Sequence, residues 1–255
     1  MPRKNLHFAA VFAACLFALP ASLAAQDIPP TDHGFISGIN LPEISGAPFS
    51  ATAVIEMQRY MPDDTTQVRR TINLIARDSS GRTHNETRRL MPEYFHGSPL
   101  LLGVRIFDPI TRIRTIYGPA DHIARRQVVP QQPETNSIVN PALHVQDLGS
   151  STLNGLPTKG TRRTYTISAK VSGTGDPVLI EDEEWYSEDL HISLLTRHYD
   201  PRYGILTVGV SSLKREEPPA SMFREPPGYK TLDVAPPTAA PSTPPGGDPL
   251  AESKP

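Results

Sequence analysis

Apolar and polar residues alternate along short runs through most of this chain. The clearest run, from residue 49 to 60, places Ala51, Ala53, Ile55 and Met57 on one parity and mainly polar residues on the other. A period of two is typical of a β-strand with one buried face. No helical apolar stripe occurs in the first half, which disfavours parallel βαβ architectures. We therefore predict an all-β fold: a curved, mostly antiparallel sheet, an open or half barrel, with a short C-terminal helical turn.

Turn residues separate the alternating runs and set the predicted strand limits. Asp78-Ser79-Ser80-Gly81 and Asn154-Gly155 are typical hairpin connections, because Asn and Gly tolerate the backbone of tight turns. Pro218-Pro219 predicts a helical turn over 220–223. The predicted strands span residues 49–60, 67–77, 82–90, 101–107, 112–117, 123–129, 145–152, 161–169, 178–186, 190–199 and 205–213.

The ends of the chain differ from its middle in composition. Arg3 and Lys4 precede an apolar run and a small-residue site at Ser22-Leu23-Ala24, which predicts a signal peptide over 1–24. The apolar run ends at Pro20 and is too short for a membrane anchor, so we expect no transmembrane segment after cleavage. The other predicted parts are an extended lead-in at 25–48, one antiparallel β domain at 49–230 and a Pro-rich, disordered tail at 231–255.

Export follows from the predicted signal peptide, so we expect a periplasmic or secreted protein. Cys15, the single cysteine, lies inside that peptide, and the mature chain must be stabilised by its apolar core rather than by disulfides. The polar segment from 130 to 141 could be a domain boundary or a loop. We favour a loop, because neither half alone has the apolar content for a comfortable core.

Charge and residue spacing exclude several functions. The net charge of −2 gives no basis for nucleic-acid binding. The histidines show no metal-binding spacing, and Gly209 to Leu213 lacks the second glycine of a hydrolase elbow. We predict no catalytic residue, no metal site and no cofactor.

Two charged features remain. Glu181-Asp182-Glu183-Glu184 could be a calcium or carboxylate cluster, but Arg162-Arg163 on the preceding strand favours cross-strand ion pairs. Arginines on wet strand faces could attract an anionic partner such as a lipid headgroup or a cell-wall polymer, although solvation is the commoner role. These arginines are Arg69, Arg70, Arg88, Arg89, Arg112, Arg114, Arg125 and Arg126.

Several segments carry a resemblance to known families. The segments GAPFSATAVIE, RDSSGRTHNE, IFDPITRIRTIYG, DLGSSTLNGLPTKGTRRTYTI, EEWYSEDL, TRHYDPRYG and FREPPGY resemble those of uncharacterised exported β-rich proteins of acidobacterial type. More distantly, the order of Trp185, the hairpin to Leu213 and the Phe223-to-Tyr229 end is similar to the periplasmic lipoprotein-carrier superfamily. That resemblance implies a half-barrel around an apolar cleft, but the lid helices of that superfamily are not evident here.

Together these observations predict a non-catalytic envelope domain that binds a hydrophobic or amphipathic ligand, such as a lipid, in the concavity of its sheet. The alternative is a structural or protein-interaction module that contacts an envelope protein through the Pro-rich tail, and a hydrolase with an unrecognised site comes third. The predicted cavity residues are Ala53, Ile55, Met57, Leu102, Val104 and Ile106. The predicted structural core residues are Trp185, Phe223 and Tyr229.

Overall fold

The computed structural model describes residues 39–131 and 143–235. The predicted signal peptide, the lead-in up to residue 38 and the tail from residue 236 lie outside the described residues. Among the described residues, no helix has the length and apolarity needed to cross a bilayer.

Thirteen strands form one sheet in the described part of the chain. They are β1 (Phe49–Tyr60), β2 (Thr66–Arg77), β3 (Thr83–Arg88), β4 (Met91–Pro92), β5 (Leu101–Asp108), β6 (Ile113–Tyr117), β7 (Ile123–Val128), β8 (His144–Leu153), β9 (Leu156–Ile167), β10 (Val178–Ser187), β11 (Ile192–Asp200), β12 (Gly204–Lys214) and β13 (Lys230–Val234). A short helix, α1 (Ala169–Ser172), and a 3-10 turn, η1 (Ala220–Phe223), complete the elements.

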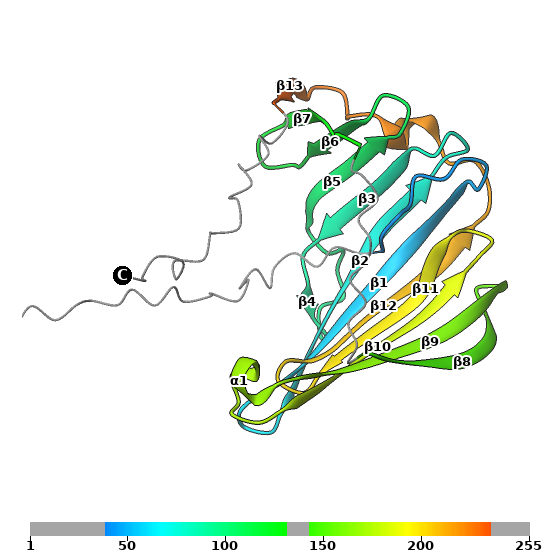
Figure 1. Cartoon of the computed structure of the whole chain (residues 1–255). Coiled ribbons are helices and arrows are strands. Elements are labelled where there is room, and N and C mark those ends of the chain that lie inside the picture. Colours follow the sequence, from blue (N-terminus) through cyan, green and yellow to red (C-terminus); the bar gives the residue numbers. More distant parts are fainter. Residues whose placement is uncertain (1–38, 132–142, 236–255) are drawn as a thin grey trace, which may run out of the picture. The chain divides into compact units, whose positions relative to one another are not determined.

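The strands neighbour one another in the order β13-β7-β6-β5-β3-β2-β1-β12-β11-β10-β9-β8, with β4 beside β2. Every ladder is antiparallel except the parallel one between β7 and β13. The sheet twists strongly from end to end and stays open between β13 and β8 (Figure 1). The all-β, mostly antiparallel prediction is therefore confirmed.

The two faces of the sheet can be followed through the strand register, because residues paired across neighbouring strands project to the same side. Ile55 pairs with Thr71 on one neighbour and with Val208 on the other. We call this side the Ile55 face. Ile106 pairs with His84, which pairs with Ala76, and these residues project to the opposite side. We call that side the Phe223 face, because Phe223 packs there.

The larger apolar cluster lies on the Ile55 face and joins the first and last long strands. Its β1 members pair with those of β12 on one side and with Ile75 of β2 on the other, so the β1–β12 ladder runs through the middle of the cluster. The cluster also includes Ile39, Leu41 and Ala47, so the end of the predicted lead-in packs onto the sheet. Its buried members are Ile39, Phe49, Ala51, Ala53, Ile55, Ile75, Leu90, Leu156, Leu190, Ile192, Leu194, Val208 and Val210.

The smaller cluster lies on the Phe223 face under residues 215–229, which we call the latch. Phe223 of η1 and Tyr229 pack onto β5 and β6 there, and the Tyr229 ring meets that of Tyr117 edge to face at 5.3 Å. The sequence prediction of a helical turn at 220–223 is confirmed. The latch thus covers one end of the sheet.

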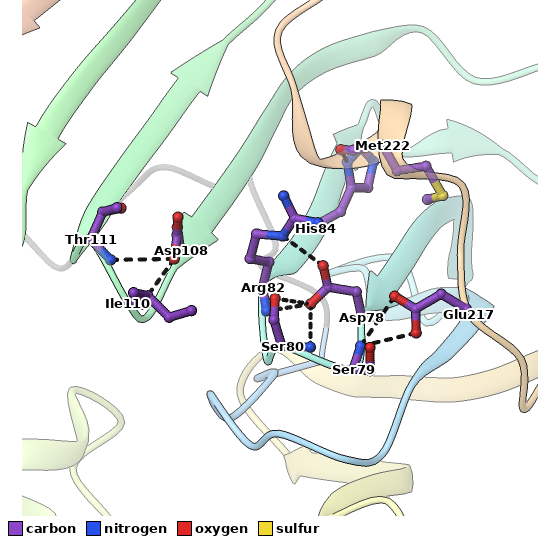
Figure 2. A network of polar contacts seen from close by, with 10 residues as sticks. All are labelled: Asp78, Ser79, Ser80, Arg82, His84, Asp108, Ile110, Thr111, Glu217 and Met222. Carbon is purple, nitrogen blue, oxygen red and sulfur yellow. Dashed lines mark hydrogen bonds and ion pairs between the residues drawn. The ribbon is translucent and has the colours of Figure 1, made fainter.

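Polar contacts fix the latch to the β2–β3 hairpin (Figure 2). Within the hairpin, Asp78 accepts hydrogen bonds from Ser80 and from Arg82, whose Nε lies 2.6 Å from Oδ2. The backbone N–H of Ser79 donates to Glu217 of the latch. His84 Nδ1 lies 2.7 Å from the Met222 carbonyl oxygen, and because a carbonyl can only accept, Nδ1 carries the proton.

β4 was not predicted, β9 begins at Leu156 rather than at 161, and two further elements differ from the sequence expectation. β13 extends the sheet to Val234, past the predicted tail boundary at residue 231, because its backbone pairs with the edge of β7. Helix α1 lies where the strand prediction ran to residue 169, and Gly173 ends it in the left-handed conformation with φ of 75°. The Asn154-Gly155 hairpin was predicted, and both residues have the positive φ that a tight β-hairpin turn requires.

Candidate functional site

Residues 39–43, which we call the strap, cross the Ile55 face and have a hollow on each side. Ile39 and Asn40 line both hollows. The hollow over β3, β5 and β6 measures about 340 Å³, and the hollow over β10, β11 and β12 about 410 Å³. We call them the arginine hollow and the glutamate hollow, and together they form the candidate site.

The buried side chain of Arg77 fixes the strap to the sheet. Arg77 is 0 % exposed, and its guanidinium donates to the carbonyl oxygens of Pro42 (3.2 Å), Ala47 (3.0 Å) and Leu190 (2.7 Å). It also lies over the Phe49 ring at 5.2 Å. Burial lowers the pKa of Arg77 from its ordinary value. One cation therefore connects β2, the strap and the β10–β11 turn.

The arginine hollow combines apolar walls with cationic groups. Ile39, Leu41, Phe107 and Val129 supply its apolar surface. Arg105, Arg114 and the Asn85 amide supply polar groups, and Asn85 Nδ2 donates to the Ile39 carbonyl oxygen at 3.2 Å. The remaining lining residues are Asn40, Glu43 and Thr83.

The glutamate hollow has one acidic side chain in its lining, Glu184. Glu184 accepts hydrogen bonds from Ser193 Oγ at 2.5 Å and from Arg163 Nη1 at 2.9 Å. Burial alone would raise the pKa of Glu184, but the Ser193 hydroxyl and the Arg163 guanidinium together lower it. The carboxylate thus stays ionised near neutral pH. Ile192 and Val208 supply the apolar floor.

A third hollow, of about 640 Å³, lies on the Phe223 face between the latch and β5–β7. Two of its charged groups are satisfied within the protein: Arg82 pairs with Asp78 at 2.6 Å, and Arg126 pairs with Glu225 at 2.8 Å. Arg82 also lies over the Phe223 ring at 5.1 Å. Arg126 and Arg82 at this hollow therefore contact the latch at Glu225 and Phe223.

The structure divides the predicted cavity residues between the two faces. Ala53 and Ile55 are buried in the cluster on the Ile55 face, and Met57 packs against them. Val104 and Ile106 are buried in the cluster on the Phe223 face. Leu102 is half-buried on the same strand as these two. The two halves of the set therefore lie on opposite faces of the sheet. The sequence could not show this, because the alternation within one strand does not reveal which parity of another strand shares its face.

The three predicted core residues occupy different environments. Phe223 is buried and Tyr229 packs beside it on the Phe223 face. Trp185 is half-buried outside both clusters, and its indole N–H donates to Glu183 Oε1 at 2.8 Å. Its ring lies against Gly160, where an added Cβ would approach the ring atoms to 2.8 Å.

The acidic run at 181–184 forms ion pairs with the neighbouring strand, as the sequence favoured. Arg162 lies 3.1 Å from Glu183, and Arg163 lies 2.9 Å from Glu184. Asp182 meets His198 Nδ1 at 2.6 Å. In residues 39–131 and 143–235, no group of three or more His, Cys, Asp or Glu side chains is placed to hold a metal ion.

Sequence reasoning missed Arg105, Arg77 and the strap as site components. Arg105 stands alone among apolar neighbours in the run 101–107, so no charge cluster drew attention to it. Arg77 occupies the last position of a predicted strand, where an arginine is normally solvated. The alternation gave no signal for it, because most apolar residues of this strand, Ile72, Leu74 and Ala76, lie on the opposite parity.

No protein-family model and no curated protein matches this chain. Solved structures similar to it include a chain of the MucA/MucB complex of Pseudomonas aeruginosa, at 14 % identity and a TM-score of 0.42, covering 74 % of this chain and 59 % of that one. An uncharacterised conserved protein from Thermus thermophilus has 12 % identity and a TM-score of 0.40, covering 74 % and 91 %. A LolA superfamily protein from Nitrosomonas europaea has 14 % identity and a TM-score of 0.30, covering 71 % and 92 %.

Proposed function

We propose that this chain is an exported, non-catalytic binding protein that holds an amphipathic ligand on the Ile55 face. The observation that carries the proposal is the pair of hollows that share Ile39 and Asn40. Each hollow falls within the range of roughly 300 to 1,000 Å³ that is usual for small-molecule sites. A ligand that contacts both hollows would cross the strap.

The lining supports an amphipathic ligand rather than a purely apolar one. Ile39, Leu41 and Phe107 give the arginine hollow apolar surface, and Ile39, Ile192 and Val208 give it to the glutamate hollow. Arg105, Arg114 and Glu184 add charged groups to these linings. Sites of this kind orient a ligand through a few polar groups and bind it through apolar contact. The leader pattern at 1–24 supports a cell-envelope location for such binding.

The chemistry of the glutamate hollow supports binding over catalysis. Ser193 and Glu184 are in hydrogen-bond contact, as a nucleophile and its base would be. The lowered pKa of Glu184 makes this carboxylate a weak base for an alcohol, because an effective general base needs a pKa near the operating pH. Arg163 further restrains the carboxylate at 2.9 Å.

Filling the glutamate hollow tests the proposal. Thr196 lines this hollow, whereas Thr207 on the adjacent strand projects to the Phe223 face. We expect Thr196→Trp to weaken the binding of a fluorescent long-chain amphipath by at least about tenfold, since the indole would occupy ligand space. Thr207→Trp is the matched control and should bind like the unmodified protein. Native mass spectrometry should show added ligand mass only where the hollow remains open.

Two results would refute this function. One is failure of the unmodified protein to bind any long-chain amphipath in solution. The other is equal weakening by both tryptophan variants, which would mean that the Ile55 face has no special role. Thermal unfolding of both variants establishes that they are folded before binding is measured.

A further inference from the structure

We propose that the ligand carries an oxyanion, a carboxylate or a phosphate, and that Arg105 and Arg114 bind it in the arginine hollow. This inference rests on the proposed function and adds the chemical class of the ligand and its direction on the sheet. The strand register, the charge pairing, the buried Nε atom of Arg114 and the lining of the glutamate hollow each support it.

The register brings the two arginines together on one face. Arg114 of β6 pairs with Phe107 of β5, and Arg105 lies two residues before Phe107 on the same strand. Diagonal neighbours of this kind lie about 7 to 8 Å apart at the backbone, within reach of long side chains. Asn85 of β3 pairs directly with Arg105. Two guanidiniums and an amide therefore project from three adjacent strands into one hollow.

Neither arginine has a carboxylate partner among the described residues, which sets them apart from many other arginines of the sheet. The acid that lines the hollow, Glu43, is bound by Arg112 at 2.6 Å. The next arginine on this face, Arg125, is bound by Asp121 at 2.5 Å. Arginines with carboxylate partners within 4.0 Å are Arg70, Arg82, Arg88, Arg112, Arg125, Arg126, Arg162, Arg163, Arg202 and Arg215.

Arg114 is also incompletely hydrogen-bonded. Its Nε atom is buried and has no partner in the described part of the chain, and its Nη2 reaches Gln127 only at 3.4 Å. A guanidinium has five N–H donors in a planar fork that matches two oxygens of a carboxylate or a phosphate. A buried donor without a partner is costly, so an oxyanion in this hollow would relieve that cost.

The rest of the Ile55 face determines the orientation in which the ligand binds. Ile39, Leu41 and Phe107 place apolar surface next to the arginines, where the tail of an anionic amphipath would begin. Beyond the strap, the described residues that line the glutamate hollow include no Arg or Lys, and their one acid, Glu184, is already bound by Arg163 at 2.9 Å. The anionic end therefore belongs in the arginine hollow, and the tail extends across the strap toward the glutamate hollow.

Competition binding with the purified full-length chain tests this inference. A fluorescent long-chain fatty acid is the reporter, displaced in turn by dodecanoate, dodecyl phosphate, dodecanol, acetate and inorganic phosphate. We expect dodecanoate or dodecyl phosphate to compete at least about tenfold better than dodecanol, because charge-assisted hydrogen bonds add to the apolar contact. Preference between the two anions identifies the headgroup as carboxylate or phosphate.

Three variants complete the experiment. Arg105→Gln and Arg114→Gln should each weaken dodecanoate or dodecyl phosphate about tenfold and leave dodecanol unchanged. Arg197→Gln is the control, since Arg197 is exposed and pairs with Thr207 on the Phe223 face. The unchanged dodecanol affinity shows that a loss of anion binding does not come from misfolding.

The outcomes separate this inference from the function on which it rests. Equal competition by dodecanol and the anionic amphipaths, or no effect of either glutamine variant, would overturn the oxyanion while preserving the amphipath site. No binding of any long-chain compound would overturn both proposals. Competition by acetate or inorganic phosphate as strong as that of the long-chain anions would also overturn the proposal, because it would show a small-anion site without a tail.

Discussion

Replacement of Arg77 by methionine removes the buried cation that connects the strap to the sheet. Methionine has a similar length and no charge, so it can fill much of the space without donating hydrogen bonds. Three carbonyl oxygens, of Pro42, Ala47 and Leu190, would lose their donor. At about 1 to 3 kcal/mol for each buried group left unsatisfied, the loss is roughly 3 to 9 kcal/mol.

An opposing contribution reduces that loss. The unpaired charge is costly to bury, and its removal recovers several kcal/mol. We therefore expect Arg77→Met to lower the free energy of unfolding by about 3 kcal/mol. With a urea dependence of roughly 2 kcal/mol per molar, the midpoint should fall by about 1.5 M. Hydrogen exchange at residues 39–47 should also become faster, because this segment loses the hydrogen bonds from Arg77 to Pro42 and Ala47.

Urea titration followed by far-ultraviolet circular dichroism measures the change. Arg70→Met is the matched control, since Arg70 is exposed beside Glu56, and its midpoint should not move. A midpoint for Arg77→Met equal to or above that of the unmodified protein would contradict the reasoning. It would show that desolvation of the guanidinium outweighs its hydrogen bonds to the strap.

Three further predictions concern the sheet and the latch. Burial lowers the pKa of His84 below 6.5, so the unfolded state binds more protons in acid than the folded state does. The free energy of unfolding should therefore fall as the pH drops from about 7 to about 5, and urea titrations of His84→Gln should show a weaker dependence on pH. Gly204→Ala should lower the free energy of unfolding by more than about 3 kcal/mol, because φ of Gly204 is +113° and the new Cβ would lie 1.8 Å from the Gln58 carbonyl oxygen. A thermal unfolding curve equal to that of the unmodified protein would contradict this geometry. Asn154→Ala should lower the free energy of unfolding by about 1 to 2 kcal/mol, because it removes a 2.8 Å hydrogen bond to the Val210 carbonyl oxygen and places alanine at a φ of 50°. An unchanged urea midpoint would refute this prediction.

Local sequence signals were sufficient to predict the positions of most of the strands. The predicted first strand at 49–60 matches β1 at both ends, because alternation and the following Pro62-Asp63-Asp64 turn act on neighbouring residues. The turn before η1 was equally visible in Pro218-Pro219. β13 could not be predicted in this way, because its five exposed residues acquire strand structure only through pairing with β7, more than a hundred residues earlier.

The site was harder to predict because it depends on how the strands are paired. Met57 and Leu102 each lie in a clear alternating run, yet nothing local to either run relates its parity to that of the other. Arg105 and Arg114 can be recognised as a site only when β5 and β6 are aligned. It must also be known that the nearby acids, Asp121 and Glu43, form ion pairs with other arginines. Pairwise charge balance across strands is therefore a property of the fold rather than of any single segment.

The order of the strands bears on how the protein folds. β1 to β7 neighbour one another almost in sequence, as do β8 to β12, and one ladder between β1 and β12 joins the two groups. Each group can form from contacts that are close along the chain, whereas the joining ladder requires closure of a very long loop. Since the cluster on the Ile55 face draws side chains from both groups, the binding face should be completed in the slowest kinetic phase. Stopped-flow refolding should therefore show strand formation before recovery of ligand binding.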